Sequence, residues 1–328
     1  MASTTNSSPK IKTRFLIVSD THGDEFPDGL KPLMSADVAI HCGDLTEESK
    51  LDEFKRSLQL LRDIDAPLNS SSSMSSENSA DKAAMEREFG TFGEAERLFS
   101  EVKDSGIVLL GEGTHTFKLA NGAKLTVFAS PYTPSKSAGW GFQYVPSQMP
   151  SDSDGHDWSI QEGTDVVITH GPPHGILDRA QDAVRGGSQG LFAAVERSRP
   201  RLHCFGHIHE GWGARLVTWR ERKHGGKADD GWPSHFTHID NGKSATIENL
   251  AGLKAGKWDS KAVEDEKRQR LEGYRNQRAC MTSHCAGDCL PLQAGEQTLF
   301  VNAAIQGESD GLEGFQLPWV VDVELPEA

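Results

Sequence analysis

The chain has 328 residues, of which 36% are hydrophobic and 25% are charged, and its formal net charge at pH 7 is −14. This composition is typical of a globular protein that is long enough to bury a large core in one or two domains, and it excludes extensive disorder. The excess of acidic residues disfavours a surface that neutralises nucleic-acid phosphates, so we expect no nucleic acid polymer among the partners.

The first residues, MASTTNSSPKIKTR, contain no apolar segment of the kind that forms the core of a secretion signal. No later run reaches the roughly 20 apolar residues that a membrane helix needs. The cysteines are Cys42, Cys204, Cys280, Cys285 and Cys289. An odd number of cysteines in a long chain favours a reducing compartment over a disulfide framework. We therefore expect a cytoplasmic protein that does not associate with membranes.

Short apolar runs rich in β-branched residues predict strands that are covered on both faces. Four of them are Phe15–Val18, Val38–Ile40, Val166–Thr169 and Leu202–Phe205. Each of these four runs is followed within a few residues by Asp or His. Further strands are predicted at Gly106–Leu110, Thr116–Ala120, Leu125–Ala129 and Thr298–Ala303. The Asn121-Gly122 pair predicts a hairpin turn between the second and third of these.

Helices are predicted at Glu48–Asp63, at Asp81–Asp104 with a break near Gly90 or Gly93, and at Leu191–Arg199, where Pro200 ends the helix. Strands and helices alternate along the chain, which indicates an α/β fold.

The predicted domain organisation is a single domain over residues 14–304. It follows a disordered N-terminus at residues 1–13 and precedes a C-terminal extension at residues 305–328. Within the domain, the serine-rich residues 69–80 are typical of a mobile linker. Residues 220–296 are charged, glycine-rich and weakly periodic, which predicts a surface insertion between two core strands.

The polar residues that follow the four strands are of types that bind metals. In chain order they are Asp20-x-His22, Gly43-Asp44, His170-Gly171 and Gly206-His207-x-His209. In extended backbone, residues i and i+2 point to the same side, so each D-x-H or H-x-H pair could direct both side chains at one ion. Mixed imidazole and carboxylate ligands suit Zn, Mn and Fe better than Mg or Ca. The sequence therefore predicts a metal site at one edge of a sheet.

These blocks resemble the signature of the calcineurin-like metallophosphoesterase superfamily, which runs D-x-H, G-D, G-N-H-D/E, H and G-H-x-H. The segments HCGDLTE, THGPPHGILD and RPRLHCFGHIHEGWG are similar to its small metallophosphoesterase-domain subgroup, which also has fungal members. The resemblance covers about Phe15–Thr218 and Thr298–Ala304. It implies an α/β fold of two packed mixed β-sheets flanked by helices.

The resemblance also implies two divalent metal ions of the Mn, Fe or Zn class. One ion would be bound by Asp20, His22 and His209. Asp44 would bridge it to a second ion bound by His170 and His207. A hydroxide shared by the ions would attack phosphorus, with Asp44 and His170 as the catalytic residues. The implied activity is hydrolysis of a small phosphoester, with phosphodiesters, including cyclic nucleotides, favoured.

The G-N-H-D/E block is absent from the sequence. It would follow a strand near Leu68 and Asn69, but there the chain enters the serine-rich segment, so we expect a core strand to be lost and sheet edges to be exposed. Asn69 has no predicted strand to hold it. The segment Leu109–His115 offers Glu112 in place of the asparagine and His115 in place of the general acid, although its spacing is one residue too long.

A missing general acid costs about 10²–10⁴ in rate, so we expect slow catalysis and a weak second metal site. Two alternatives to a phosphodiesterase therefore stay open. One is a catalytically degraded scaffold that still binds metal. The other is a phosphoprotein phosphatase.

Several further residues are weaker candidates for a functional role. His174, in the turn after His170, and Trp140 are candidate substrate contacts, because an aromatic ring could stack on a flat leaving group. His41 and His203 lie within strand runs and are expected to be structural.

Near the C-terminus, Cys280, His284, Cys285 and Cys289 form a Cys₃His set, which is a known zinc ligand combination, but they lack the usual C-x₂-C pair. Arg197, Arg199 and Arg201 could attract phosphate, although arginines at a helix end are usually solvated.

Overall fold

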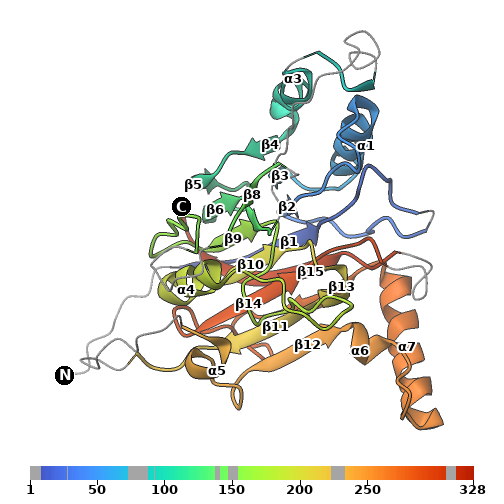
Figure 1. Cartoon of the computed structure of the whole chain (residues 1–328), viewed down its shortest axis with the longest axis vertical. Helices are drawn as coiled ribbons and strands as arrows, with labels where there is room; N and C mark the ends of the chain where they lie inside the picture. Colours follow the sequence, from blue (N-terminus) through green and yellow to red (C-terminus); the bar gives the residue numbers. More distant parts are fainter. Residues whose placement is uncertain are drawn as a thin grey trace.

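The computed structural model of the protein describes residues 9–27, 29–72, 88–91, 93–136, 141–146, 154–222, 233–307 and 315–328. Two mixed β-sheets pack against each other at the centre, and helices lie outside them (Figure 1). The expected α/β fold of two packed mixed sheets flanked by helices is therefore confirmed.

The first sheet has six strands, and its central strands come from both ends of the chain. In spatial order they are β13 (Cys280–Ser283), β15 (Trp319–Pro326), β1 (Lys10–Val18), β2 (Val38–His41), β3 (Leu68–Ser72) and β4 (Ile107–Leu110). Strands β1 to β4 are parallel to one another, whereas β15 runs antiparallel to β1.

The second sheet has seven strands. In spatial order they are β12 (Ala245–Asn249), β11 (Gly213–Thr218), β14 (Gln297–Asn302), β10 (Leu202–Phe205), β9 (Val166–Thr169), β6 (Lys124–Ser130) and β5 (Gly113–Lys118). Strands β14, β10, β9 and β6 are parallel. Strands β5 and β6 form the predicted hairpin, in which Gly122 adopts a φ of +90° that favours glycine. A separate parallel pair joins β7 (Thr133–Pro134) to β8 (Gln143–Tyr144).

The helices in the described ranges are α1 (Leu51–Arg62), α3 (Glu94–Glu101), α4 (Gln189–Ser198), α5 (His235–His238), α6 (Leu250–Leu253) and α7 (Lys261–Gln277). Two short 3₁₀ turns are η1 (Lys103–Ser105) and η2 (His209–Gly211). None of these helices combines the length and the apolar character needed to cross a membrane. Helix α7 projects away from the sheets (Figure 1).

The local sequence explains where the helices begin and end. Helix α4 begins after Ser188, whose hydroxyl accepts a hydrogen bond from the Leu191 amide at 3.0 Å. It ends at Arg199, which is left-handed and is followed by Pro200. Helix α3 begins after Gly93, which is left-handed with a φ of 76°. The predicted helix end at Pro200 and the break near Gly93 are both confirmed, and residues 81–87 lie outside the described ranges.

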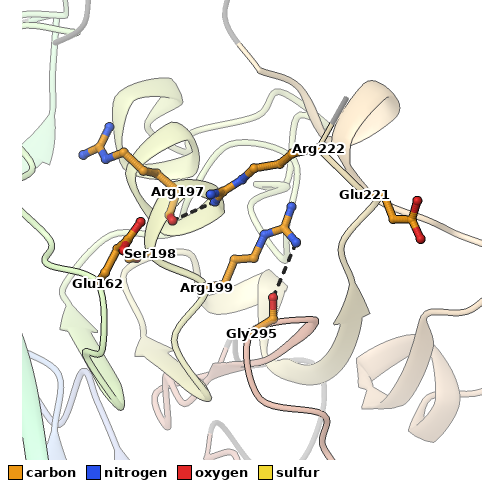
Figure 2. A pocket seen from close by; sticks show the side chains of 7 residues that line it. All are labelled: Glu162, Arg197, Ser198, Arg199, Glu221, Arg222 and Gly295. Carbon is orange, nitrogen blue, oxygen red and sulfur yellow. Dashed lines mark hydrogen bonds between the residues drawn. The ribbon is translucent and has the colours of Figure 1, made fainter. Parts of the chain in front are cut away.

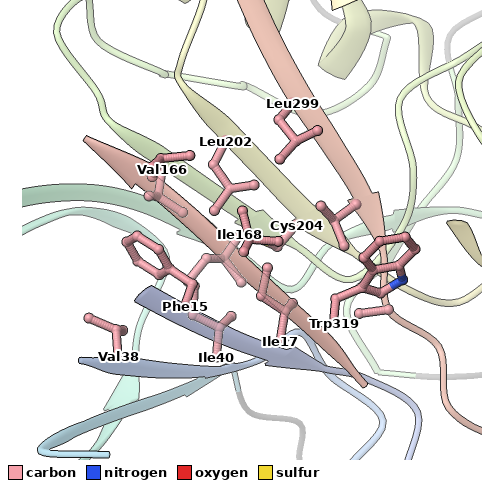
Figure 3. Close-up of a cluster of buried hydrophobic side chains, with 14 of the residues drawn as sticks. Phe15, Ile17, Val38, Ile40, Val166, Ile168, Leu202, Cys204, Leu299 and Trp319 are labelled. Atoms are coloured by element: carbon pink, nitrogen blue, oxygen red, sulfur yellow. The ribbon is translucent and has the colours of Figure 1, made fainter. Parts of the chain in front are cut away.

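The main apolar core lies between the two sheets (Figure 3). Phe15 and Ile17 of β1 face Ile168 of β9 and Cys204 of β10 within it. The alternate residues of β1 point outward and pack under α1 and α3. Strand residues of the second sheet likewise pack under α4 on its outer face. Both faces of these strands are covered, which is why their sequences are continuously apolar rather than alternating.

The expected loss of a core strand near residue 69 is wrong. Residues 68–72 form β3, which pairs in parallel with β2 on one side and β4 on the other. Strand pairing uses backbone groups, so small serine side chains suffice where both neighbouring strands are in place. The linker prediction therefore fails for residues 69–72, and residues 73–80 lie outside the described ranges.

Three other predicted boundaries also differ from the structure. Strand β1 begins at Lys10, so residues 10–13 are ordered. The segment 220–296 is not only a surface insertion, because it contributes the edge strands β12 and β13 to the two sheets. The C-terminal extension contains β15, a central strand of the first sheet. Each error concerns a strand whose partner is distant in sequence, and local sequence patterns carry no information about such partners.

Candidate metal centre

The six candidate metal residues lie in four loops that follow β1, β2, β9 and β10. Backbone hydrogen bonds join these loops. The Asp20 amide donates to Gly43 O at 3.0 Å, and the His22 amide donates to Asp44 O at 3.0 Å. The Gly206 amide donates to His170 O at 2.9 Å. The His207 amide, after β10, also donates to Asp20 Oδ2 at 3.0 Å, so the carboxyl ends of strands from both sheets meet at one site.

Left-handed backbone, rather than extended backbone, brings the side chains together. Asp20, His22, Asp44 and His207 have φ values of 55°, 49°, 49° and 67°. The argument from i and i+2 in extended chain is therefore wrong, because these residues lie in tight turns after the strands end. Left-handed backbone at a residue other than glycine costs roughly 1 kcal/mol or more, and such strain clusters at functional sites.

The first group consists of Asp20, His22 and His209, whose ligand atoms all lie within 4.8 Å of one another. The Asp20 carboxylate is fully buried and lies 3.4 Å from His209 Nε2. Both of its oxygens accept hydrogen bonds from the His207 amide, at 3.1 and 3.0 Å. Burial by itself would raise the pKa of Asp20, but the hydrogen bond from His209 and the charge of His170 hold this pKa well below its usual range.

The second group consists of Asp44, His170 and His207, whose ligand atoms also lie within 4.8 Å of one another. Asp44 Oδ2 is 3.3 Å from His170 Nε2. Burial acts to lower the pKa of His170, but Asp44 raises it to about 9. Burial lowers the pKa of His207 to about 4, so this ring is neutral at pH 7 and can donate a lone pair. A cation that binds here must displace the proton on His170.

The donor atoms fit a pair of divalent metal ions. Each group offers one carboxylate and two imidazoles, a set that suits Zn, Mn or Fe. His22 Nε2 is buried and has no hydrogen-bond partner in the described part of the chain, while Nδ1 of the same ring lies 2.5 Å from Glu47 Oε2. A buried ring nitrogen without a partner is costly, and coordination of a metal ion would satisfy it.

A cavity of about 280 Å³ opens onto both groups. Its described lining includes His22, Asp44, His170 and His207. The remaining lining residues are Leu45, Thr46, Glu47, Ser49, Phe54, Thr133, Gly141 and Gln143. The volume lies near the lower end of the range for small-molecule sites.

A larger cavity, of about 620 Å³, lies at the C-terminal end of α4 and contains no candidate metal residue (Figure 2). Its arginines are already engaged with backbone carbonyls. Arg222 donates to Arg197 O at 2.7 Å, and Arg199 donates to Gly295 O at 3.4 Å. Cationic side chains at this position stabilise the negative end of a helix, so these residues have a structural role.

The two strand histidines are structural, as expected. His41 and His203 are fully buried, and burial lowers their pKa values to about 4 and about 3. The Gly43 amide donates to His41 Nδ1 at 3.3 Å, and Thr21 Oγ1 lies 2.9 Å from His41 Nε2. His41 therefore connects the loop after β1 to the loop after β2.

The structure describes one of the two candidate substrate contacts. His174 lies 3.8 Å from Asp178 and is not among the residues that line that cavity. Trp140 lies outside the described residues. Tyr144, from the same aromatic segment, packs against Trp158 in the core, so part of that segment serves packing.

Neither Glu112 nor His115 joins the two groups. Glu112 accepts a hydrogen bond from Ser130 at 2.8 Å and lies 2.7 Å from His156 Nε2. His115 is exposed and its Nε2 lies 2.8 Å from Gly111 O. Asn69 belongs to β3 and pairs with Ala39 and Ile107.

The four-residue Cys₃His set does not form a metal group in the described part of the chain. Both ring nitrogens of His284 have other partners, namely Leu290 O at 2.7 Å and Thr282 Oγ1 at 2.9 Å. Cys280 and Cys285 are buried, Cys289 is exposed, and none of them forms a disulfide.

Comparison with known proteins finds relatives that carry a metallophosphoesterase domain. No family model matches the chain. However, the chain is 35% identical over 215 residues to human metallophosphoesterase domain-containing protein 1, and this match covers 61% of the chain and 62% of the relative. The mouse protein of the same name matches to the same extent. The chain is therefore similar to metallophosphoesterase-domain proteins, and this similarity supports a place in the metallophosphoesterase superfamily.

Other similarities are more limited. Probable rhamnogalacturonate lyase C of Emericella nidulans is 33% identical over 209 residues, which are 63% of this chain but 18% of that protein. The chain therefore spans less than two thirds of the length of these relatives. A purple acid phosphatase from yellow lupin seeds aligns at 10% identity with a TM-score of 0.30, over 65% of this chain and 40% of that one, a likeness too distant to define the fold.

Sequence reasoning identified the candidate ligands but missed Glu47, Thr133 and Gln143 in the cavity lining. One of these had a detectable signal. Gln143 lies between Phe142 and Tyr144, and a polar residue between two aromatic residues in a short strand points away from the core.

Proposed function

We propose that the protein is a metal-dependent phosphoester hydrolase, with a phosphodiester as its favoured substrate. The observation that carries the proposal is the pair of donor groups that open onto one cavity, with four of the six donors on strained, left-handed backbone. The similarity to metallophosphoesterase domain-containing protein 1 supports the same conclusion.

Bound divalent cations would supply the attacking water and stabilise negative charge on the phosphoryl oxygens. The chain positions its own donors for this purpose. The His207 amide orients both oxygens of Asp20, and Glu47 Oε2 lies beside Nδ1 of His22. Such contacts behind the ligands fix their geometry before any cation binds.

The cavity favours a small substrate. Its volume of about 280 Å³ accommodates a compact phosphoester rather than a folded phosphoprotein surface. A cyclic nucleotide is one phosphodiester of suitable size, and we retain a cytoplasmic location as part of the proposal.

The test is hydrolysis of bis(p-nitrophenyl) phosphate by protein loaded with Mn²⁺. We expect turnover by the wild-type protein and a loss of about 10²-fold or more in Asp44→Asn, because this variant removes the carboxylate of the second group. Asp182→Asn, on an exposed turn, is the matched control and should keep full activity. No turnover with any divalent metal would contradict the proposal.

The two alternatives predict different metal contents or different substrate preferences. A degraded scaffold would bind about one ion per chain, measured by elemental analysis, and would not hydrolyse any ester. A phosphoprotein phosphatase would prefer a phosphoserine peptide to the aryl diester.

A further inference from the structure

We propose that Gln143 completes the second donor group, with its side-chain carbonyl oxygen as an additional ligand beside Asp44, His170 and His207. This inference rests on the proposed metal-dependent function. Gln143 would supply an amide oxygen as a metal ligand, although the G-N-H-D/E block is absent from the sequence.

The short β7–β8 pair places Gln143 on the His170 side of the cavity. Gln143 is the register partner of Thr133. Thr133 in turn lies against Gly171, the residue directly after His170. A Cβ added to Gly171 would lie 3.1 Å from the methyl group of Thr133. Gln143 and Thr133 line the same cavity as Asp44 and His170.

Strand alternation directs the Gln143 side chain toward this cavity. The next residue, Tyr144, is buried in the core cluster with Trp158, and its hydroxyl donates to Asp154 at 3.1 Å. Because successive strand residues point to opposite sides, Gln143 faces away from that cluster.

The carbonyl oxygen of Gln143 lacks a partner. Oε1 is buried and accepts no hydrogen bond within the described part of the chain. A buried hydrogen-bond acceptor without a partner costs about 1–3 kcal/mol, so we expect a hydrogen-bond donor or a metal cation to bind it. An amide oxygen is an uncharged ligand for divalent cations. It would raise the protein ligands of the second group from three to four without adding charge.

A different role would be donation from the Gln143 amide NH₂ group to a phosphoryl oxygen of the substrate. The two roles respond in opposite ways to a carboxylate at this position. A carboxylate binds a cation more tightly than an amide does, whereas it repels a phosphate.

The experiment is a calorimetric titration of Mn²⁺ into metal-free protein. Wild-type protein should bind two ions. Gln143→Leu should weaken one of them by about 10- to 100-fold and leave the other unchanged, and Gln143→Glu should bind both ions at least as tightly as wild type. Gln161→Leu is the matched control, because Gln161 is exposed and precedes the opposite, amino-terminal end of β9.

The unchanged first site shows that each variant is folded. If Gln143→Leu keeps both affinities, the inference is overturned, and hydrolysis by the wild-type protein still supports the proposed function. If both variants keep their metal affinities and only raise KM for the aryl diester, Gln143 contacts the substrate and the inference is also wrong. If wild-type protein binds no second ion, the dinuclear function fails together with the inference.

Discussion

Gly206 lies directly against the carboxylate of Asp20. A Cβ at position 206 would collide with Asp20 Oδ2 and with the side chain of Ser19. The following amide, that of His207, orients the same carboxylate. The glycine in the G-H-x-H block is therefore required by the close approach of a ligand, and not by its own backbone angle.

We expect Gly206→Ala to displace Asp20 and to weaken Mn²⁺ binding at the first group by about 10-fold or more. Calorimetric titration measures this affinity. Gly111→Ala is the control, because no atom lies within 4 Å of a Cβ added there. Equal affinities in the two variants would show that the contact between Gly206 and Asp20 does not position the ligand.

At the scale of single residues, the sequence was sufficient to predict the candidate ligands but not the residues that surround them. Asp20 and His207 could be found because each follows an apolar run and has a side chain of a type that binds metal ions. The position of Gln143 between two aromatic residues gave a signal that its side chain points away from the core. Its proposed role as a ligand could not be predicted, because that role depends on the contact of Thr133 with Gly171, which is distant in sequence.

At the scale of elements, an ion-pair cluster joins the first and last strands of the first sheet. Arg14 of β1 donates two hydrogen bonds to Asp322 of β15, at 2.7 and 2.9 Å, and Lys12 Nζ lies 2.9 Å from the same carboxylate. Burial acts to raise the pKa of Asp322, but Arg14 and Lys12 hold this pKa below its usual range.

A carboxyl group whose pKa is depressed by folding stabilises the protein above its unfolded pKa, about 4, and loses this effect as the pH falls. We therefore expect Asp322→Asn to lower the free energy of unfolding by about 1.5–3 kcal/mol at pH 7 and by less at pH 3. Urea unfolding at both pH values measures the difference. Glu327→Gln, at an exposed position just beyond β15, should match wild type, and a penalty for Asp322→Asn that does not depend on pH would contradict this explanation.

The elements that could be predicted were those with a strong local pattern. Strands β9 and β10 follow directly from apolar runs, and the end of helix α4 follows from Pro200. Strand β3 could not be predicted, because Leu68 is its single large apolar residue and its pairing depends on β2 and β4.

At the scale of the whole molecule, the candidate metal centre joins the two sheets. The first group takes Asp20 and His22 from the loop after β1 of one sheet, and His209 from the loop after β10 of the other. The second group likewise takes Asp44 from one sheet and His170 from the other. A cation in either group therefore links both halves of the core.

Because the donors converge only in the folded state, metal binding should stabilise the fold. Mn²⁺ at 100 times its Kd should add about 2.7 kcal/mol for each site, and removal of metal with EDTA should lower Tm accordingly. Differential scanning calorimetry with and without EDTA measures this shift. An unchanged Tm in a protein that elemental analysis shows to be loaded with metal would exclude such a link between the sheets.

The pairing of β1 with β15 also has a consequence for synthesis on the ribosome. Residues from Lys10 to Ile17 pair with residues from Pro326 back to Trp319, so one side of β1 stays unpaired until β15 emerges. The nascent polypeptide must therefore remain open, with apolar residues accessible to chaperones, while the residues between these two strands are translated. In a series of arrested chains, protease resistance of the first sheet should appear only after Pro326 has left the exit tunnel, and earlier resistance would show that this sheet closes without its final strand.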